Sequence, residues 1–360
     1  MWWRSSRQGL PGTDGPGCAT SPSPNHSLPA PAKILSPLPP HDPTEGARCA
    51  QTSFAGEPVA GSCGPAALRL WRHPGATLEI QLRIGTGALH GALHQLAERL
   101  ASACERLQQD YRQAPVKHAD ETGWRTDGCN GYAWLFCSPQ TSLFRFRQTR
   151  SGQVAQEVLG EQLLTGVLVV DRYPGYNRAP CPLQYCYAHL LREVQDLEKE
   201  FPEHVEVLVF VSMFAPLLSA AMKLRRQALE PAEFGTQASQ LKDRIADWSE
   251  NAAHHPGIQR IQNIFREHPA RLYHWAENPA VPADNNFAER ELRPLVIARK
   301  ISFGSQSEKG ARTREVLMSV LHTLRKRQGD TTAFFERTLN ALSGDDALNP
   351  YDALFKFDSS

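Results

Sequence analysis

The spacing of hydrophobic and polar positions changes several times along this chain of 360 residues. From residue 78 to residue 113, leucines recur at steps of three and four, which predicts a largely helical segment. From residue 116 to residue 150, the period falls to two in three short aromatic runs separated by glycine-containing turns. This alternation predicts three strands, arranged as an antiparallel meander.

The pattern after residue 150 predicts a short helix and two further strands. Residues 154–164 have helical spacing, and an apolar strand then ends at Asp171, directly before a Pro-Gly turn. Another strand runs into a helix within residues 183–201. Helical patterns then dominate three segments, which are residues 190–278, 285–300 and 312–327.

Three hairpin strands followed by β-α-β elements is the order of a ribonuclease-H-like α/β fold with a mixed sheet. The helical stretch is expected as a long all-helical insertion before the last catalytic helix. The predicted organisation begins with a tail at residues 1–75 and a helical lead-in at 76–115. A ribonuclease-H-like domain follows at 116–345, with its helical insert at 190–278, and the chain ends in a tail at 346–360.

Composition changes this picture mainly at the N-terminus. Residues 1–75 hold 13 of the 27 prolines, so they cannot keep a helical or strand period and are expected to be disordered. A proline-rich partner motif is the alternative. The formal net charge of +1 excludes a uniformly basic coat for nucleic acid but leaves room for a local basic face.

Cysteine spacing and apolar runs exclude further classes. None of the eight cysteines forms a C-x-x-C pair, which argues against a zinc ribbon. The N-terminus lacks the apolar core of a signal peptide. The longest apolar stretch, near residues 205–221, is interrupted by polar residues and proline. We therefore expect no membrane partner and a cytoplasmic location.

Three acidic residues lie where carboxylates could meet. Asp120 lies in the first predicted strand, Asp171 ends an apolar strand, and Glu289 lies in the first turn of a helix. Clustered carboxylates repel one another unless a cation joins them, and Mg²⁺ prefers such oxygen ligands. Two such ions can hold the attacking and the leaving oxygens of a phosphoryl displacement.

Each of these acids also has a structural alternative. Asp120 could be a solvated carboxylate, with Glu121 as its rival, although period two places the two on opposite faces. Asp171 could only start the following turn. Glu289 could form a capping box with Asn286 or pair with the arginine four residues further on.

Longer motifs surround these acids in order. They are D-E-T at 120–122, D-R-Y-P-G-Y at 171–176, C-Y-A-H at 186–189, D-N-N-F-A-E-R-E-L-R-P at 284–294 and R-K-I-S-F-G-S at 299–305. Together they resemble the DDE transposases of the insertion-sequence-66 family, in which tryptophan usually stands at the position of Tyr187. The resemblance covers roughly residues 80–345.

This resemblance implies that Asp120, Asp171 and Glu289 form a catalytic, metal-binding triad. It implies two Mg²⁺ ions, for which Mn²⁺ can substitute, and cleavage at transposon ends followed by 3′-OH strand transfer into target DNA. The implied partners are DNA, further copies of the chain in an active homo-oligomer, and accessory proteins of the same element. The implied location is the bacterial cytoplasm, in association with the nucleoid.

Residues 1–75 do not resemble the DNA-binding segment with which family members usually begin. We therefore also expect a truncated or frame-disrupted copy as an alternative. Two other functions stay open, namely a defective remnant that only binds DNA and a general ribonuclease-H-like nuclease.

Supporting residues surround the triad in the sequence. Cys186 and His189 form a C-x-x-H pair that is either a buried structural pair or, for His189, a group near the active centre. The F-G-S motif at 303–305 could place backbone amides on a phosphate, and Trp124 and Trp134 are expected in the core. The residues expected to contact DNA phosphates are Arg290, Arg293, Arg299, Lys300, Lys309 and Arg312.

Overall fold

The computed structural model describes residues 66–72, 76–82 and 85–356, with side chains from residue 85 onward. All of these lie in one compact unit, Gly64–Ser360. The predicted tail up to residue 65 lies outside the described residues, so its predicted disorder stays a prediction.

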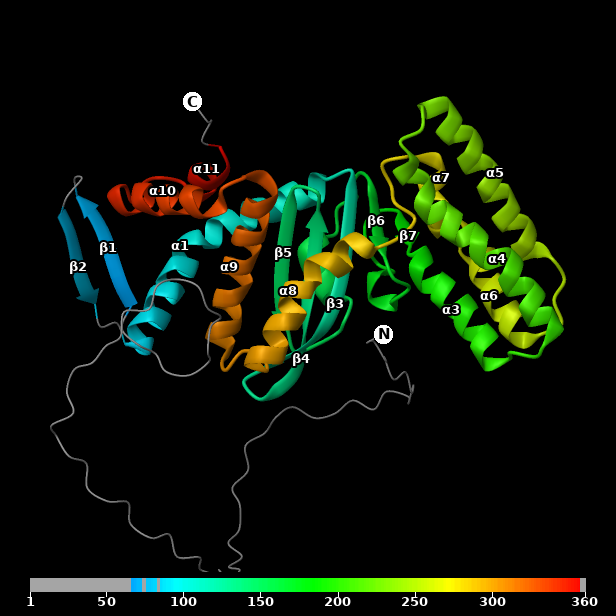
Figure 1. Cartoon of the computed structure of the whole chain (residues 1–360), viewed down its shortest axis with the longest axis horizontal. Helices are drawn as coiled ribbons and strands as arrows, with labels where there is room; N and C mark the ends of the chain where they lie inside the picture. The colour runs from blue at the N-terminus through cyan, green and yellow to red at the C-terminus, as the bar shows by residue number, and fades with distance from the viewer. Residues whose placement is uncertain (1–65, 73–75, 83–84, 357–360) are drawn as a thin grey trace, which may run out of the picture. The chain divides into compact units, whose positions relative to one another are not determined.

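A five-stranded mixed sheet forms the centre of this unit (Figure 1). Its strand order is β5-β4-β3-β6-β7, with β3–β4 and β4–β5 antiparallel and β6 and β7 parallel to β3. The predicted meander, the two later strands and the ribonuclease-H-like class are confirmed. The strands are β3 (Val116–Thr126), β4 (Cys129–Ser138), β5 (Thr141–Arg147), β6 (Val167–Val170) and β7 (Leu183–Tyr185).

Period two separates the side chains of the sheet into two buried layers. On one side, Ala119, Trp134 and Phe136 belong to the cluster that contains residues of α1 (Thr86–Gln113) and α2 (Gln153–Leu159). On the other side, Trp124 and Leu135 pack with Ala288, Leu292 and Leu295 of α8 (Asn286–Ser302). Both tryptophans are buried in the core, as expected.

The edge strand β5 is closed by side chains of α9 (Glu308–Arg327). The amides of Ser142, Phe144 and Phe146 donate to Thr323 Oγ1, Ser319 Oγ and Glu315 Oε2 at 3.0, 2.9 and 3.1 Å. These acceptors are spaced by four residues, so one helix face meets alternate amides of the strand. The helix thereby covers an edge that could otherwise pair with another chain.

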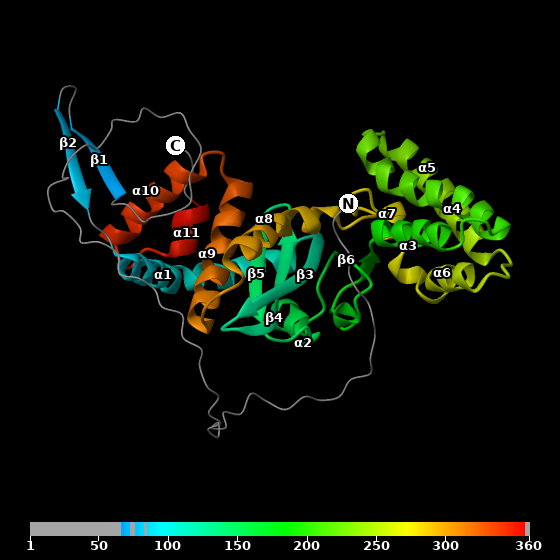
Figure 2. The same cartoon turned by 60° about the horizontal axis from the view of Figure 1, so that its bottom comes forward.

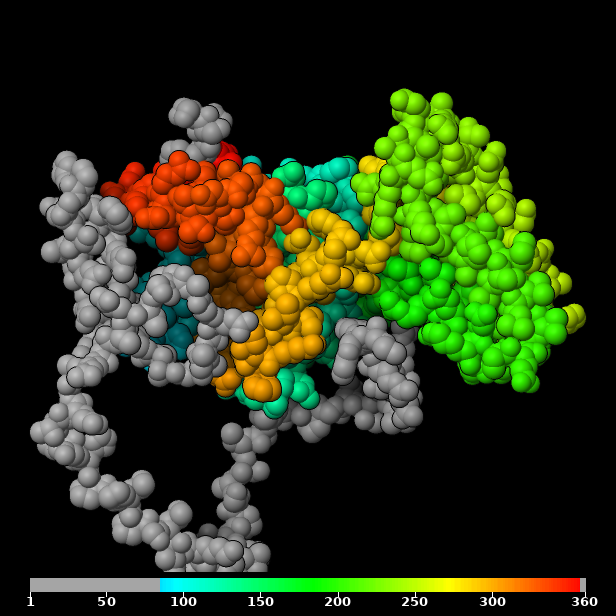
Figure 3. All heavy atoms as spheres, viewed as in Figure 1, coloured from blue at the N-terminus to red at the C-terminus, as the bar shows by residue number. Residues whose placement is uncertain are grey.

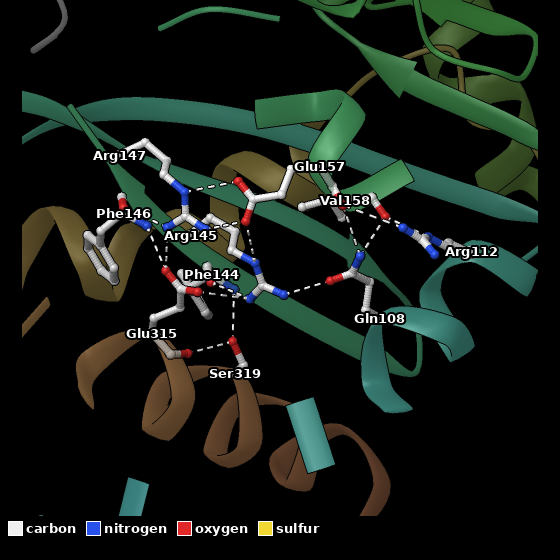
Figure 4. Close-up of polar contacts among 10 residues, drawn as sticks. All are labelled: Gln108, Arg112, Phe144, Arg145, Phe146, Arg147, Glu157, Val158, Glu315 and Ser319. Carbon is white, nitrogen blue, oxygen red and sulfur yellow. Dashed lines mark hydrogen bonds and ion pairs between the residues drawn. The ribbon is translucent and has the colours of Figure 1, made fainter. Parts of the chain in front are cut away.

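Two arginines of β5 tie α1, α2 and α9 together (Figure 4). Arg145, whose side chain is only 9% exposed, lies 3.4 Å from Glu315 and donates to Gln108 Oε1 at 2.8 Å. Arg147 pairs with Glu315 at 2.9 Å and also with Glu157. Because Arg145 and Glu315 are largely removed from water, each depends on the other for its compensation.

The predicted helical insertion is present between β7 and α8 (Figures 1 and 2). It consists of α3 (Tyr187–Glu200), α4 (Val205–Leu224), η2 (Arg225–Gln227), α5 (Pro231–Glu250), α6 (Pro256–Glu267), η3 (Pro269–Arg271) and α7 (His274–Glu277). It leads directly into α8, as the predicted order requires.

The longest apolar segment forms a single helix despite its polar interruptions. The helical stretch Val205–Gln227 is long and apolar enough to cross a membrane by length and composition. Its polar interruptions are too few to prevent this. One face, including Phe210, Phe214 and Leu218, is buried in the core, and core helices commonly pass the same test, so this is weak evidence for a span.

The structure also differs from prediction at both ends of the described region. A hairpin of β1 (Ala66–Arg72) and β2 (Ala76–Leu82) occupies residues assigned to the tail and the lead-in helix, and α1 begins only at Thr86. The run L-E-I-Q-L at 78–82 has period two, which fits a strand. Two C-terminal helices, α10 (Thr331–Gly344) and α11 (Pro350–Phe355), were not predicted.

Candidate active site

The sheet register places Asp120 and Asp171 side by side. In the parallel pair β3–β6, His118 aligns with Val169, and each aspartate follows its aligned residue by two positions. Adjacent strands lie about 4.8 Å apart, so the register makes the two aspartates neighbours, with Asp120 inside β3 and Asp171 just after the end of β6. Asp171 directly follows β6 and leads into the turn at η1 (Pro174–Tyr176).

Backbone amides orient both carboxylates. Asp120 Oδ1 accepts from the Glu121 amide at 2.9 Å, and Asp171 Oδ1 accepts from the Tyr173 amide at 2.9 Å. Asp171 therefore does start the turn, as its structural alternative proposed. The Oδ2 atoms make no hydrogen bond or ion pair to the described residues.

Asn285, the residue before α8, fixes the helix against β3. Its Nδ2 donates to the Ala119 carbonyl at 2.9 Å, and its backbone amide donates to Cys186 Sγ at 3.1 Å. Its Oδ1 lies 2.9 Å from Nδ1 of His118 and therefore accepts a hydrogen bond from that ring nitrogen. Burial lowers the pKa of His118 to about 4, so the ring is neutral near pH 7.

Glu289 follows this clamp by one turn of α8 and is near enough to Asp120 for its charge to act on the pKa of that carboxyl. The pKa of Asp120 is raised well above its usual range by burial first, then by the charges of Glu121 and Asp171, and least by that of Glu289. The Glu289 carboxylate makes no hydrogen bond or ion pair with the described residues. Neither the capping box with Asn286 nor the ion pair with Arg293 is therefore present, and Asn286 has no side-chain partner there.

Glu121 faces the opposite side of β3 and has its own structural role. Its Oε2 accepts from the Tyr176 hydroxyl at 2.6 Å, and its Oε1 accepts from Nε of Arg150 at 2.9 Å. Burial and the charge of Asp171 raise its pKa. Glu121 thus holds the D-R-Y-P-G-Y turn through Tyr176, on the face of β3 opposite Asp120. Its position beside Asp120 in the sequence does not reveal this role.

The C-x-x-H pair divides into a structural and a site-facing member. Burial raises the pKa of Cys186 to about 12, and its sulfur is engaged by the Asn285 amide. His189 is close enough to Asp171 and Glu289 for both charges to act on its pKa, which burial lowers. Its buried Nδ1 has no hydrogen-bond partner in the described structure.

Basic side chains surround the start of α8. A cavity of about 690 Å³ is lined by four arginines, Arg225, Arg226, Arg290 and Arg327, together with His118 and Phe287. Arg226 lies 3.6 Å from Asp284, and Arg327 lies 2.8 Å from Asp110. Arg225 and Arg290 have no ion pair among the described residues, so this wall of the cavity carries uncompensated positive charge.

The other predicted phosphate contacts differ in availability. Arg293, Lys300, Lys309 and Arg312 are exposed. Arg299 instead donates to Thr122 Oγ1 at 2.9 Å and to the Gly123 carbonyl, which holds the end of α8 on β3. Two of the three F-G-S amides are not free, because the Phe303 amide donates to the Arg299 carbonyl at 2.9 Å and the Ser305 amide donates to the Arg125 carbonyl at 2.8 Å.

The donor set fits a hard divalent cation in its chemistry. Asp120, Asp171 and Glu289 supply only carboxylate oxygens, and no cationic side chain of the described residues pairs with them. Within the part of the chain that the structure describes, however, no three His, Cys, Asp or Glu side chains are already close enough to hold a metal ion together. The three carboxylates therefore do not surround one common metal position in this arrangement.

The mixed sheet, its helical insertion and this acidic cluster define a ribonuclease-H-like protein. A family model described as Transposase IS66 family matches residues 67–313, more than half of the chain. The chain therefore belongs to the IS66 family of DDE transposases.

Two relatives come from Sinorhizobium fredii. The uncharacterized protein y4jD is 25% identical over 307 residues, which cover 76% of this chain and 59% of the relative. The uncharacterized protein y4qI is 22% identical over 309 residues, covering 77% of this chain and 57% of the relative. The chain thus spans less than two thirds of the length of either relative.

Proposed function

We propose that this chain carries the catalytic domain of a DDE transposase that cleaves DNA at transposon ends and transfers the 3′-hydroxyl into target DNA. The observations that support the proposal are the register of β3 and β6, which makes Asp120 and Asp171 neighbours, and the charges of Asp171 and Glu289, which both act on the pKa of Asp120. Membership of the IS66 family supports the same reaction.

The three carboxylates are assigned to two Mg²⁺ ions, for which Mn²⁺ can substitute. Asp120 and Asp171 would offer the oxygens that their backbone hydrogen bonds leave free, and Glu289 would complete the set by side-chain rotation. When bound, such ions activate the attacking oxygen and stabilise the leaving oxygen of an in-line phosphoryl displacement.

The surrounding residues are assigned to the DNA strand. Arg225 and Arg290 lie on the cavity next to the start of α8, where phosphates would compensate their charge. Arg293, Lys300, Lys309 and Arg312 extend this basic surface. His189 has an unpartnered Nδ1 beside Asp171 and Glu289, which suits a hydrogen bond to the strand being cleaved.

Strand transfer joins two transposon ends to one target, which favours a homo-oligomer as the active form. Accessory proteins of the same element are proposed as further partners. The substrate places the reaction at the bacterial nucleoid.

The test is divalent-metal-dependent cleavage and strand joining on DNA that carries the element's own ends, with any missing recognition segment supplied. Asp120→Asn, Asp171→Asn and Glu289→Gln should each lower the rate by several orders of magnitude. Glu198→Gln removes an exposed carboxylate on α3 and is the matched control. Full activity in any triad variant would refute the assignment of that residue.

Two other functions are outcomes of the same assay. Binding of DNA without cleavage by the unchanged chain would identify a DNA-binding remnant. Cleavage without end specificity or joining would identify a general nuclease.

A further inference from the structure

An aromatic side chain is exposed at the end of α8 in a backbone conformation that disfavours it. Phe303 has φ +56° and ψ 6°, in the left-handed region, and 74% of its surface is exposed. A helix often ends on a left-handed residue, but that residue is usually glycine, because a side chain is strained there. Phe303 gains little burial in return, so neither packing nor backbone preference explains it.

The residues that follow Phe303 hold it in place. Ser305 forms a parallel bridge with Thr126, and its Oγ accepts from Nε1 of the buried Trp124 at 3.1 Å. Gly304 passes so close to the Arg125 carbonyl that a Cβ would lie 2.2 Å from its oxygen. Residues 304 and 305 are therefore fixed to the β3–β4 hairpin, and Phe303 projects from this rigid segment.

Two further exposed apolar side chains lie in the last turns of α8, before Phe303. Ile297 and Ile301, at 58% and 75% exposed, lie on the same stretch of α8, which runs along the surface on the face seen in Figure 3. Exposed cationic side chains of α8 and the start of α9 are Arg290, Arg293, Lys300, Lys309 and Arg312, of which Lys309 lies 3.7 Å from Glu98. This charge favours a polyanion over a second protein surface.

We propose that Phe303 is a wedge that enters a base step of duplex DNA while cations of α8 and α9 hold the phosphates. Apolar side chains that enter DNA between base pairs unstack them, kink the duplex and lower its twist. The inference rests on the proposed function, because it assumes that DNA lies along α8.

The fold also sets the position of the wedge. Phe303 lies fourteen positions after Glu289, which corresponds to about 21 Å at about 1.5 Å per residue. The six residues from Asp120 to Thr126 on β3 give about 20 Å. At about 3.4 Å per base pair, the disturbed step lies about six base pairs from the reacting phosphate.

The test is unwinding of plasmid DNA by the full chain, which needs no knowledge of the transposon ends. A closed circular plasmid is relaxed by a topoisomerase in EDTA with the protein bound, and its linking number is measured after the protein is removed. The unchanged chain should leave a linking deficit. Phe303→Ala should reduce this deficit several-fold at equal occupancy, while Phe303→Trp should keep it.

Leu163→Ala is the matched control, because Leu163 is 87% exposed and lies outside α8. An unchanged deficit in Phe303→Ala, with occupancy checked by fluorescence anisotropy, would overturn the wedge. A linking deficit that falls equally in Leu163→Ala would also overturn the wedge. A loss of oligomer mass in Phe303→Ala with unwinding intact would overturn it as well, and would identify Phe303 as part of an interface between copies. Failure of the unchanged chain to bind any DNA would contradict the proposed function as well, whereas binding without a linking deficit would contradict the wedge alone.

Discussion

Neutralising Asp120 should raise the stability of the fold when no divalent cation is present. Asp120→Asn keeps the size of the side chain and an oxygen for the Glu121 amide, but it removes the charge. Burial and the charges of Glu121 and Asp171 raise the pKa of Asp120, so its ionised form is disfavoured in the folded state. A solvated surface aspartate would show no such gain.

The register sets the size of the effect. Two carboxylates on adjacent strands lie about 5 Å apart, and at an effective dielectric constant of about 20 they repel by about 3 kcal/mol. Asp171 is partly exposed, so solvent screening leaves about 1–3 kcal/mol. At roughly 2–4 °C per kcal/mol, Tm should rise by about 2–12 °C in EDTA.

Magnesium should reverse the order of the melting temperatures of the unchanged chain and Asp120→Asn. A ligand at about 100 times its Kd stabilises the folded state by about 2.7 kcal/mol, and only the unchanged chain retains all three carboxylates to bind it. Adding Mg²⁺ should therefore raise Tm of the unchanged chain and leave Asp120→Asn nearly unaffected.

The dependence on pH has a definite sign. Because the pKa of Asp120 is raised on folding, its proton stabilises the folded state fully below the unfolded pKa of about 3.9. This stability is lost as the pH rises through the folded pKa. The advantage of Asp120→Asn should therefore be small in acid and largest at neutral pH.

Differential scanning calorimetry in EDTA and in Mg²⁺, from pH 4 to pH 8, measures all three effects. Glu198→Gln should change Tm little under any condition. A lower Tm for Asp120→Asn in EDTA, or the same Mg²⁺ response in both proteins, would refute the clustered-carboxylate reasoning.

Four further variants test other parts of the structure. Glu315→Ala leaves the buried Arg145 without its closest carboxylate and should cost about 3 kcal/mol in urea unfolding, whereas the exposed Glu105→Ala should cost almost nothing. Phe303→Gly relieves the left-handed strain and should gain about 0.5–1 kcal/mol in the same assay, and a loss would show that Phe303 packs. Asn285→Ala unpairs the Ala119 carbonyl and should cost about 2 kcal/mol and abolish cleavage, so retained activity would show that the clamp does not position Glu289. Lys300→Ala should reduce the slope of the logarithm of the DNA-binding constant against the logarithm of salt concentration by about 0.9. Arg299→Ala should mainly lower Tm, because Arg299 is hydrogen-bonded to Thr122 and Gly123.

Local periodicity was sufficient for most elements of the fold. The alternation in residues 116–150 identified β3, β4 and β5, and the apolar run before Asp171 identified β6. Periodicity gave the wrong element at L-E-I-Q-L (78–82). A leucine-rich helix, α1, begins four residues later, and the helical prediction was extended backward over the residues that form β2. Periodicity also gave too much weight to single polar residues in Val205–Gln227.

The sequence motifs selected the carboxylates but not the contacts that hold them. The clamp at Asn285 joins residues 166 positions apart in the sequence, so no local pattern contains it. The D-N-N motif was its only sequence signal. Likewise, period two separated Glu121 from Asp120, but its partners Arg150 and Tyr176 depend on how the later turn folds under the sheet. The roles of the triad in catalysis stay predictions.

The central claim is that Asp120, Asp171 and Glu289 share divalent cations. The most direct measurement is anomalous scattering from Mn²⁺ in crystals of the chain bound to duplex DNA. The account predicts manganese peaks within coordination distance of the Asp120 and Asp171 carboxylates, with Glu289 turned toward them, and loss of these peaks in Asp120→Asn. Manganese bound only elsewhere, or peaks unchanged in Asp120→Asn, would contradict it.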